Sequence, residues 1–402
     1  MVIGVSGPVD IELLESDFGN TPIPKTNTFP LTSHFVNALT KRGYRVIVYT
    51  NSGEISTPTV LHSDQVTVCI GCTKPQPGRR IFKYERDQLQ SLMQEYPADI
   101  IYAFWTYEYA WAALDSGIPT VVSVHDIARK ILVNQPDMFR LVRFFMNAIV
   151  MWKSKWLVAN SSYTYAQLSA RNKKKATVIN NFYTPHLDDL PVGTAKENYI
   201  VSVVMGFTKR KGVPKALHAF ARLRKKFPTL EYKLIGADME PGGDAQKYAQ
   251  QHNIEEGVRF LGPLSHPELM QHVAGAKALL HPSVEESFGM AVLESMIVGT
   301  PVVGGRKSGF IPHLLNHGGA GVLCDINSDE EMSAGVARLL SDTLFAGQVA
   351  SNAYAFARAN FSEDVVVAQH LQLYSEILNT GNSYSPIAVT QKENSPLLNN
   401  QL

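Results

Sequence analysis

Two glutamates in the second half of the chain are the residues best placed to do chemistry. Glu286 lies in a polar loop after the apolar stretch 278–280, and Glu294 lies inside a helix expected to begin near Gly289. The start of a helix offers free backbone N–H groups and the positive end of the helix dipole, which suits a phosphate. Glu294 is about one and a half turns further along, where its carboxylate could accept hydrogen bonds from sugar hydroxyls. Taken as bare carboxylates, the two would more often be a helix-start acid and a solvated helix residue.

A basic turn, Lys209-Arg210-Lys211, lies earlier in the same half, between an apolar strand and the next helical pattern. Lys211 and either Lys209 or Arg210 would stand beside a diphosphate and stabilise the charge that develops as it leaves. An exposed basic loop is the alternative. No Asp-x-Asp pair ends a strand, so the sequence predicts no carboxylate site for a divalent metal. The cations and the helix dipole would replace it.

These residues need a framework, and the chain supplies short apolar strands that alternate with amphipathic helices. That alternation predicts parallel β-α-β units. The pattern predicts thirteen strands, and a twisted open sheet rarely exceeds about ten. The expected fold class is therefore α/β, with two doubly wound, Rossmann-like domains facing a cleft. The polar, turn-rich stretch at 182–197 separates a domain of residues 1–190 from one of residues 195–360. Ligands bind such domains at the carboxyl ends of the strands, so the site is expected in the cleft.

The end of the chain divides into a helix and a tail. A helical pattern at 361–380 follows the last strand and is expected to pack back toward the first domain. Residues 381–402 are rich in Ser, Asn, Gln and Pro, and this composition predicts a disordered tail.

The order Pro-Ser-x-x-Glu-Ser-Phe-Gly-x4-Glu-x-Met, which contains Glu286 and Glu294, resembles the signature of family-4 retaining glycosyltransferases of the GT-B fold. The stretch at 205–212 resembles the basic phosphate-binding turn of that family, and those at 234–236 and 260–262 resemble its nucleotide-facing strand ends. The resemblance covers about residues 1–380 and is most specific between residues 206 and 323.

The resemblance implies a retaining glycosyltransferase of hexosyltransferase type. It would move a sugar from a UDP- or GDP-sugar, held by the second domain, to a glycan or lipid-linked acceptor, held by the first. The sugar nucleotide is a substrate and no cofactor is expected. The implied catalytic residues are Glu286 at the transferred sugar, Lys211 at the diphosphate and His125 at the end of a first-domain strand. The implied donor-binding residues are Glu294, Lys209, Arg210, Gly206, Phe288, Gly289, Met290, Gly236 and Leu264.

The chain departs from the family pattern at two places. Phe207 stands where the family commonly has an arginine, so the second cation must be Lys209 or Arg210. The family's Gly-Gly pair before the first helix is missing; Thr26 and Asn27 align with it, and Gly19 is the other candidate for the acceptor and phosphate loop.

Two smaller patterns in the first half could also bear on the site. Asp126 would either orient His125 or cap the next helix. Cys69 and Cys72 form a lone C-x-x-C, which is short of the four ligands of a zinc site and is better explained as two buried small residues.

Composition and charge limit the partners. Lys and Arg number 37 against 36 Asp and Glu, so binding to nucleic acid through bulk positive charge is not expected. Three cysteines make no disulfide framework, the first residues show no signal-peptide pattern, and no apolar run is long enough to span a membrane. These features predict a cytoplasmic protein.

Positive charge is nevertheless concentrated at 128–175, which has ten Lys or Arg and one acid, Asp137. Within it, the segment 138–156 mixes large aromatic residues with basic ones. Such a helix could lie on an anionic membrane at its inner face, as a peripheral contact. A helix buried on its apolar side and solvated on its basic side is the alternative.

Two other functions fit the same residues. One is a GT-B sugar-nucleotide epimerase, and the other is a non-catalytic partner that binds sugar nucleotide or glycan. The presence of Glu286, Lys211 and Glu294 together argues against a non-catalytic partner, which would not need all three.

Overall fold

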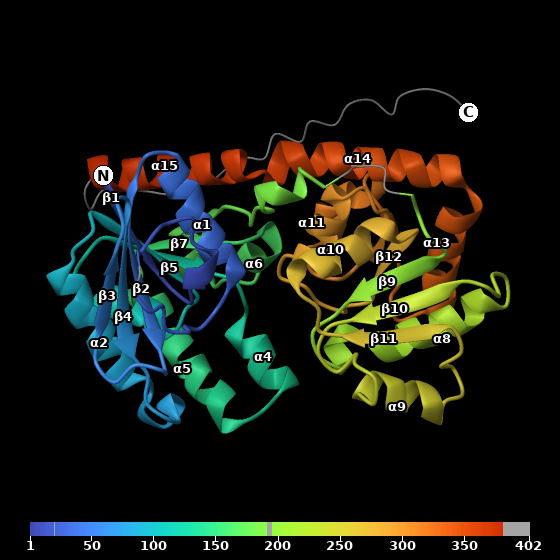
Figure 1. Cartoon of the computed structure of the whole chain (residues 1–402), viewed down its shortest axis with the longest axis horizontal. Coiled ribbons are helices and arrows are strands. Elements are labelled where there is room, and N and C mark those ends of the chain that lie inside the picture. Colours follow the sequence, from blue (N-terminus) through green and yellow to red (C-terminus); the bar gives the residue numbers. More distant parts are fainter. Residues whose placement is uncertain (20, 191–194, 381–402) are drawn as a thin grey trace.

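The computed structural model describes residues 1–19, 21–190 and 195–380, which form two α/β domains beside each other (Figure 1). The expected fold class is confirmed. The first domain has an eight-stranded sheet in the order β3-β4-β2-β1-β5-β6-β7-β8, parallel except for the pair β3 and β4. Its strands are β1 Val2–Ser6, β2 Arg45–Ser52, β3 Thr59–His62, β4 Val66–Cys72, β5 Ile100–Phe104, β6 Thr120–Val124, β7 Trp156–Ala159 and β8 Ala176–Val178.

The second domain has a six-stranded parallel sheet in the order β11-β10-β9-β12-β13-β14. The order reverses between β9 and β12, which is where a doubly wound sheet opens a crevice for ligands. Its strands are β9 Tyr199–Val203, β10 Glu231–Ile235, β11 Val258–Gly262, β12 Ala278–His281, β13 Val302–Gly305 and β14 Val322–Cys324.

Helices cover both sheets and two of them close the chain. Those of the first domain are α1 Pro30–Lys41, α2 Lys83–Glu95, α3 Glu108–Asp115, α4 Ala128–Asn134, α5 Met138–Lys153, α6 Ser162–Ala166 and α7 Ala170–Lys173. Those of the second are α8 Val213–Arg224, α9 Asp244–Gln251, α10 His266–Gly275, α11 Met290–Ile297, α12 Ile311–Leu314 and α13 Asp329–Ser341, followed by α14 Thr343–Phe361 and α15 Glu363–Thr380. None of the described helices is long and apolar enough to cross a membrane.

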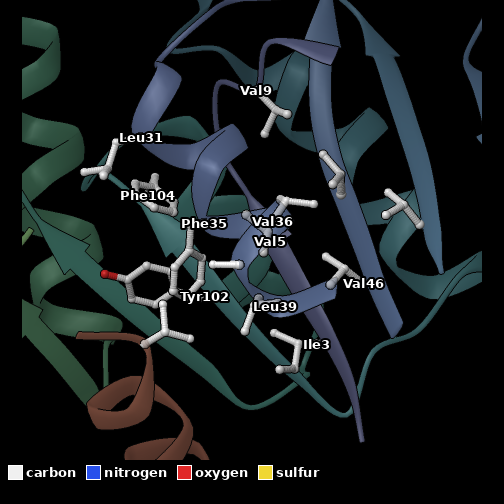
Figure 2. Packing of buried hydrophobic residues seen from close by; sticks show 14 of the residues in the cluster. Ile3, Val5, Val9, Leu31, Phe35, Val36, Leu39, Val46, Tyr102 and Phe104 are labelled. Carbon is white, nitrogen blue, oxygen red and sulfur yellow. The ribbon is translucent and has the colours of Figure 1, made fainter. Parts of the chain in front are cut away.

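The first-domain core explains why α1 forms and where it lies. Pro30 occupies its first turn, and its apolar residues recur at helical spacing, so that Phe35, Val36 and Leu39 share the face that packs on β1 (Figure 2). Each such side chain contributes roughly 1.5–3 kcal/mol when it is buried.

The last two helices tie the domains together. They lie end to end along one side of the molecule, α14 over the second domain and α15 over the first (Figure 1). Val366, Val367 and Tyr374 of α15 belong to the buried cluster of the first domain, whereas Ala353 of α14 belongs to that of the second. The expected tail, residues 381–402, and part of the expected boundary, residues 191–194, lie outside the described residues.

Candidate active site

The loop between β12 and α11 carries the first glutamate and depends on two glycines. Gly289 starts α11 with φ of 106°, and a Cβ there would lie 2.6 Å from Cδ1 of Ile311. Gly309 has φ of 62°, and its Cβ would lie 2.1 Å from the carbonyl oxygen of Glu286, which accepts a hydrogen bond from the Phe310 N–H at 3.0 Å. The backbone of Glu286 is therefore fixed before any ligand arrives.

The side chain of Glu286 is a buried anion between two cationic or polar groups. Oε1 lies 2.7 Å from Nζ of Lys211 and 3.6 Å from Nε2 of His281, and both lysine and glutamate side chains are about seven-eighths buried. Burial alone would raise the pKa of Glu286, but the neighbouring His281 and Lys211 outweigh it and hold the pKa well below the usual range. Glu286 is thus a carboxylate at any working pH.

The basic turn is folded against this loop as the 3-10 helix η4 Lys209–Lys211. Gly212 ends it with φ of 67°, and a Cβ there would lie 2.1 Å from the carbonyl oxygen of Pro282. Arg210 donates from its guanidinium to the carbonyl oxygen of Glu285 at 3.1 Å, whereas Lys209 is exposed and its ammonium has no hydrogen bond to any described residue. Of the two candidates for the second cation, the structure brings Arg210 into contact with the site loop.

The start of α11 has unpaired backbone donors. Within the described part of the chain, the backbone N–H groups of Gly289 and Met290 have no hydrogen-bond acceptor, as expected for a helix start. The ring of Phe288, in contrast, is buried and stacks on Phe310 at 5.3 Å, so only its backbone is available to a ligand.

Glu294 lies one turn into α11 and contacts α10. Its Oε1 lies 3.2 Å from Nε2 of His266, and this hydrogen bond raises the pKa of the histidine although burial lowers it. Leu264, two residues before His266, is half-buried. Leu264 lies in the short loop between β11 and α10, and His266 is the first residue of α10, so the loop leads directly to the partner of Glu294.

Two glycines bring the strand ends of the second domain together. Gly236 has φ of 124°, and a Cβ there would lie 1.9 Å from the carbonyl oxygen of Val204. Gly206 has φ of 89° and its N–H donates to the carbonyl oxygen of Ala237 at 3.1 Å. A side chain at Gly236 would displace backbone beside the basic turn, and one at Gly206 would be strained by its positive φ, so both positions favour glycine.

His125 follows β6 in the first domain and is surrounded by aromatic rings. It stacks on Phe104 at 5.4 Å and meets Phe29 edge-on at 5.7 Å, and its Nε2 lies 2.8 Å from Oγ of Ser123. Burial lowers the pKa of His125 to about 4. Neither expectation for Asp126 is met, since its carboxylate accepts instead from the Tyr107 hydroxyl at 3.0 and 3.1 Å.

The structure places the three predicted residues of the acceptor and phosphate loop, Gly19, Thr26 and Asn27, in two different settings. Thr26 donates to the carbonyl oxygen of Val9 just beyond β1, and Asn27 donates to the Tyr109 hydroxyl at 3.3 Å, so both are held at the strand ends of the first domain. Gly19 is exposed, with φ of 64°, and no described atom lies within 4 Å of the place that a Cβ would take. The structure brings Thr26 and Asn27 to the strand ends and leaves Gly19 in an open turn.

The two domains meet at the glutamate loop. Lys130 donates to Oε1 of Glu285 at 2.7 Å, and the Tyr163 hydroxyl donates to the same oxygen. The Ser161 hydroxyl, just after β7, donates to the carbonyl oxygen of Ser287. The site therefore lies between the carboxyl ends of the strands of both domains. Sequence reasoning missed Lys130, Tyr163, Glu285, His281 and His266.

Comparisons with known proteins agree with this arrangement. Residues 190–356 match the family model described as Glycosyl transferases group 1, and residues 31–187 match Glycosyltransferase Family 4. The N-acetyl-alpha-D-glucosaminyl L-malate synthase of Bacillus anthracis is 24% identical over 72% of this chain and 78% of its own. The MMP alpha-(1->4)-mannosyltransferase of Mycolicibacterium hassiacum is 30% identical, but over only 45% of this chain and 44% of its own.

Solved structures share the fold at low identity. The sucrose-phosphate synthase of Thermosynechococcus elongatus superposes with a TM-score of 0.73 over 94% of this chain and 99% of its own, at 18% identity. Anabaena HepE in complex with UDP-glucose gives 0.64 over 93% and 99%, at 19% identity. The chain thus has the GT-B fold, its two halves each match a glycosyltransferase family model, and the relatives named here are glycosyltransferases.

Proposed function

We propose that the protein is a retaining, metal-independent glycosyltransferase that moves a hexosyl group from a nucleoside-diphosphate sugar to a glycan or lipid-linked acceptor. The observation that carries the proposal is the Lys211–Glu286 pair beside the unpaired backbone donors at the start of α11. It offers an anion and a cation within 2.7 Å of each other, next to free backbone donors. A sugar nucleotide presents the matching charges when its glycosidic bond breaks.

The donor would lie with its diphosphate at the start of α11 and at Lys211, and its ribose hydroxyls at Glu294. Negative charge develops on the departing diphosphate, and Lys211, Arg210 and the helix dipole stabilise it. Positive charge develops on the sugar ring, and the Glu286 carboxylate stabilises that charge more in the transition state than in the ground state. The acceptor hydroxyl would attack from the face that the diphosphate leaves, and no protein nucleophile is proposed.

The relatives support the donor class. The names of two of them are those of a glucosaminyl-malate synthase and a mannosyltransferase, and HepE was crystallised with UDP-glucose. A UDP- or GDP-sugar is therefore the proposed substrate, with no bound cofactor.

The test is incubation of the full chain with UDP-glucose, UDP-N-acetylglucosamine, UDP-galactose and GDP-mannose, with and without glycan and alkyl-glycoside acceptors. Acceptor-dependent release of nucleoside diphosphate, with a product of retained anomeric configuration by NMR, is expected. Conversion of the donor without an acceptor would instead indicate an epimerase. Donor binding with no turnover would indicate a non-catalytic partner.

The acceptor side suggests a membrane contact, at the surface formed by α4 and α5. Six large apolar side chains there are exposed, namely Val133, Met138, Phe139, Phe145, Ile149 and Trp152. A hollow of about 310 Å³ beside them is lined by Phe144 and Trp152 together with Arg129 of α4 and Arg171 of α7. Exposed aromatic residues next to guanidinium groups suit the interface of an anionic bilayer.

We propose that this surface rests on an anionic membrane and receives a lipid-linked acceptor. Sedimentation with phosphatidylcholine vesicles containing phosphatidylglycerol should capture the protein, and Phe145→Ser with Trp152→Ser should release it. Leu344→Ser is the matched control, because Leu344 is 86% exposed on α14, away from this surface. Equal sedimentation of both variants would refute the membrane contact without touching the donor site.

A further inference from the structure

A line of hydrogen bonds runs from the core of the first domain to His125. Tyr102 on β5 donates from its hydroxyl to Oγ of Ser123 on β6 at 2.8 Å, and Oγ of Ser123 lies 2.8 Å from Nε2 of His125. Tyr102 and Ser123 are buried. The Tyr102 ring lies among the core side chains, and its hydroxyl oxygen points away from Ile3, Val5 and Leu39 (Figure 2).

The protons in this line can be assigned one by one. Within the described residues, the Tyr102 hydroxyl has no hydrogen-bond partner other than Ser123, and burial raises the pKa of Tyr102 well above its usual value, so it keeps its proton. If that proton pointed elsewhere, the buried hydroxyl would donate no hydrogen bond, so it points to Oγ of Ser123. Oγ of Ser123 accepts the hydrogen bond from Tyr102, so the one proton of the Ser123 hydroxyl is donated to Nε2 of His125. Nε2 is the acceptor, so the neutral ring carries its proton on Nδ1.

The surroundings of His125 favour this neutral form. Phe104 stacks on one face of its ring, Phe29 meets it at a steep angle, and the adjacent Asp126 directs its carboxylate to Tyr107. His370 of α15, itself uncharged by burial, packs behind Tyr102 at 4.7 Å between ring centroids. No carboxylate among the described residues is hydrogen-bonded to the His125 ring, so nothing holds a second proton on it.

We infer that Ser123 and Tyr102 are positioning residues that hold His125 as the Nδ1–H tautomer, a neutral hydrogen-bond donor to a hydroxyl of the transferred sugar and not a proton acceptor. The tautomer follows from the protein alone. Its use toward the sugar rests on the proposed function.

The tautomer is tested by NMR of the full chain labelled with ¹⁵N in its histidines, with the His125 signals assigned by their loss in His125→Gln. At pH 7 we expect a protonated Nδ1 and an unprotonated Nε2. Ser123→Ala should abolish this preference, whereas Ser123→Thr, which keeps the hydroxyl, should retain it. A protonated Nε2 in the wild type, or an unchanged tautomer in Ser123→Ala, would overturn the inference. Thermal unfolding of each variant shows whether it is folded.

The use of Nδ1 is tested by two amide substitutions at His125. An Asn amide nitrogen can occupy the place of Nδ1, whereas a Gln amide nitrogen reaches that of Nε2. With the sugar nucleotide that the wild type turns over, His125→Asn should keep at least tenfold more kcat than His125→Gln. Equal activities would refute the sugar contact. A wild type that turns over no sugar nucleotide would refute both the contact and the proposed function, and the tautomer result would stand.

Discussion

Removal of the Lys211 ammonium should have two effects that the structure keeps apart. In the free protein, Lys211→Ala leaves the Glu286 carboxylate buried with His281 at 3.6 Å as its remaining neighbour. Loss of a charged hydrogen bond costs about 1.5–3 kcal/mol, so the free energy of unfolding should fall by that amount. During turnover, the same change removes a cation from the leaving diphosphate. The kcat should fall on the order of 10²-fold or more.

Urea unfolding measures the first effect, and steady-state transfer at saturating donor measures the second. Lys215→Ala is the matched control, because Lys215 is exposed on the adjoining helix α8. The double variant Lys211→Ala/Glu286→Gln removes the uncompensated charge, so it should be more stable than the sum of the two single losses predicts. Wild-type turnover by Lys211→Ala would show that the diphosphate lies elsewhere, and strict additivity would show that the ion pair contributes nothing.

Three further predictions concern the glutamate pair, the metal requirement and a buried histidine. Glu294→Gln should mainly raise the donor KM, by a factor equivalent to about 1.5–3 kcal/mol of binding free energy, because the ribose is held in both ground and transition states. Glu286→Gln should mainly lower kcat. Weak donor binding with normal turnover in Glu286→Gln would contradict these roles. Transfer should survive excess EDTA, and a complete loss that Mg²⁺ restores would refute the metal-free mechanism. Burial lowers the pKa of His370 from 6.5 to about 3, so below pH 6.5 only the unfolded chain takes up that proton. The free energy of unfolding should therefore fall by about 1.6 kcal/mol between pH 6.5 and 5 from this group, and His370→Leu should flatten the decline; an unchanged slope would count against it.

The sequence predicts most strands of the two sheets because the inner strands are apolar on both faces. Among the thirteen strands that the pattern predicts, those at Thr120–Val124 and Trp156–Ala159 have the bounds that the structure gives to β6 and β7. The strand β3, Thr59–His62, was missed. It is a four-residue antiparallel edge strand next to a proline, and its pairing with β4 is set by tertiary contact and not by its own pattern.

The sequence likewise predicts some residues of the candidate site and not others. Glu286, Lys211 and Glu294 were found because motif spacing places them around one strand end and one helix start. The partners of this set could not be found, because Lys130 meets Glu285 across 155 residues of chain and only the packing of the two domains joins them. Asp126 was misjudged for a related reason, since its sequence neighbour is His125 but its spatial neighbour is Tyr107.

The central claim is that Glu294, Lys211 and the start of α11 form a sugar-nucleotide site, and calorimetric titration of UDP and GDP into the full chain tests it most directly. One of the two nucleotides should bind once per chain, and Glu294→Gln should weaken that binding by about 10- to 100-fold, the equivalent of a lost charged hydrogen bond. Lys215→Ala should bind like the wild type. Binding of neither nucleotide, or binding that Glu294→Gln leaves unchanged, would contradict the account.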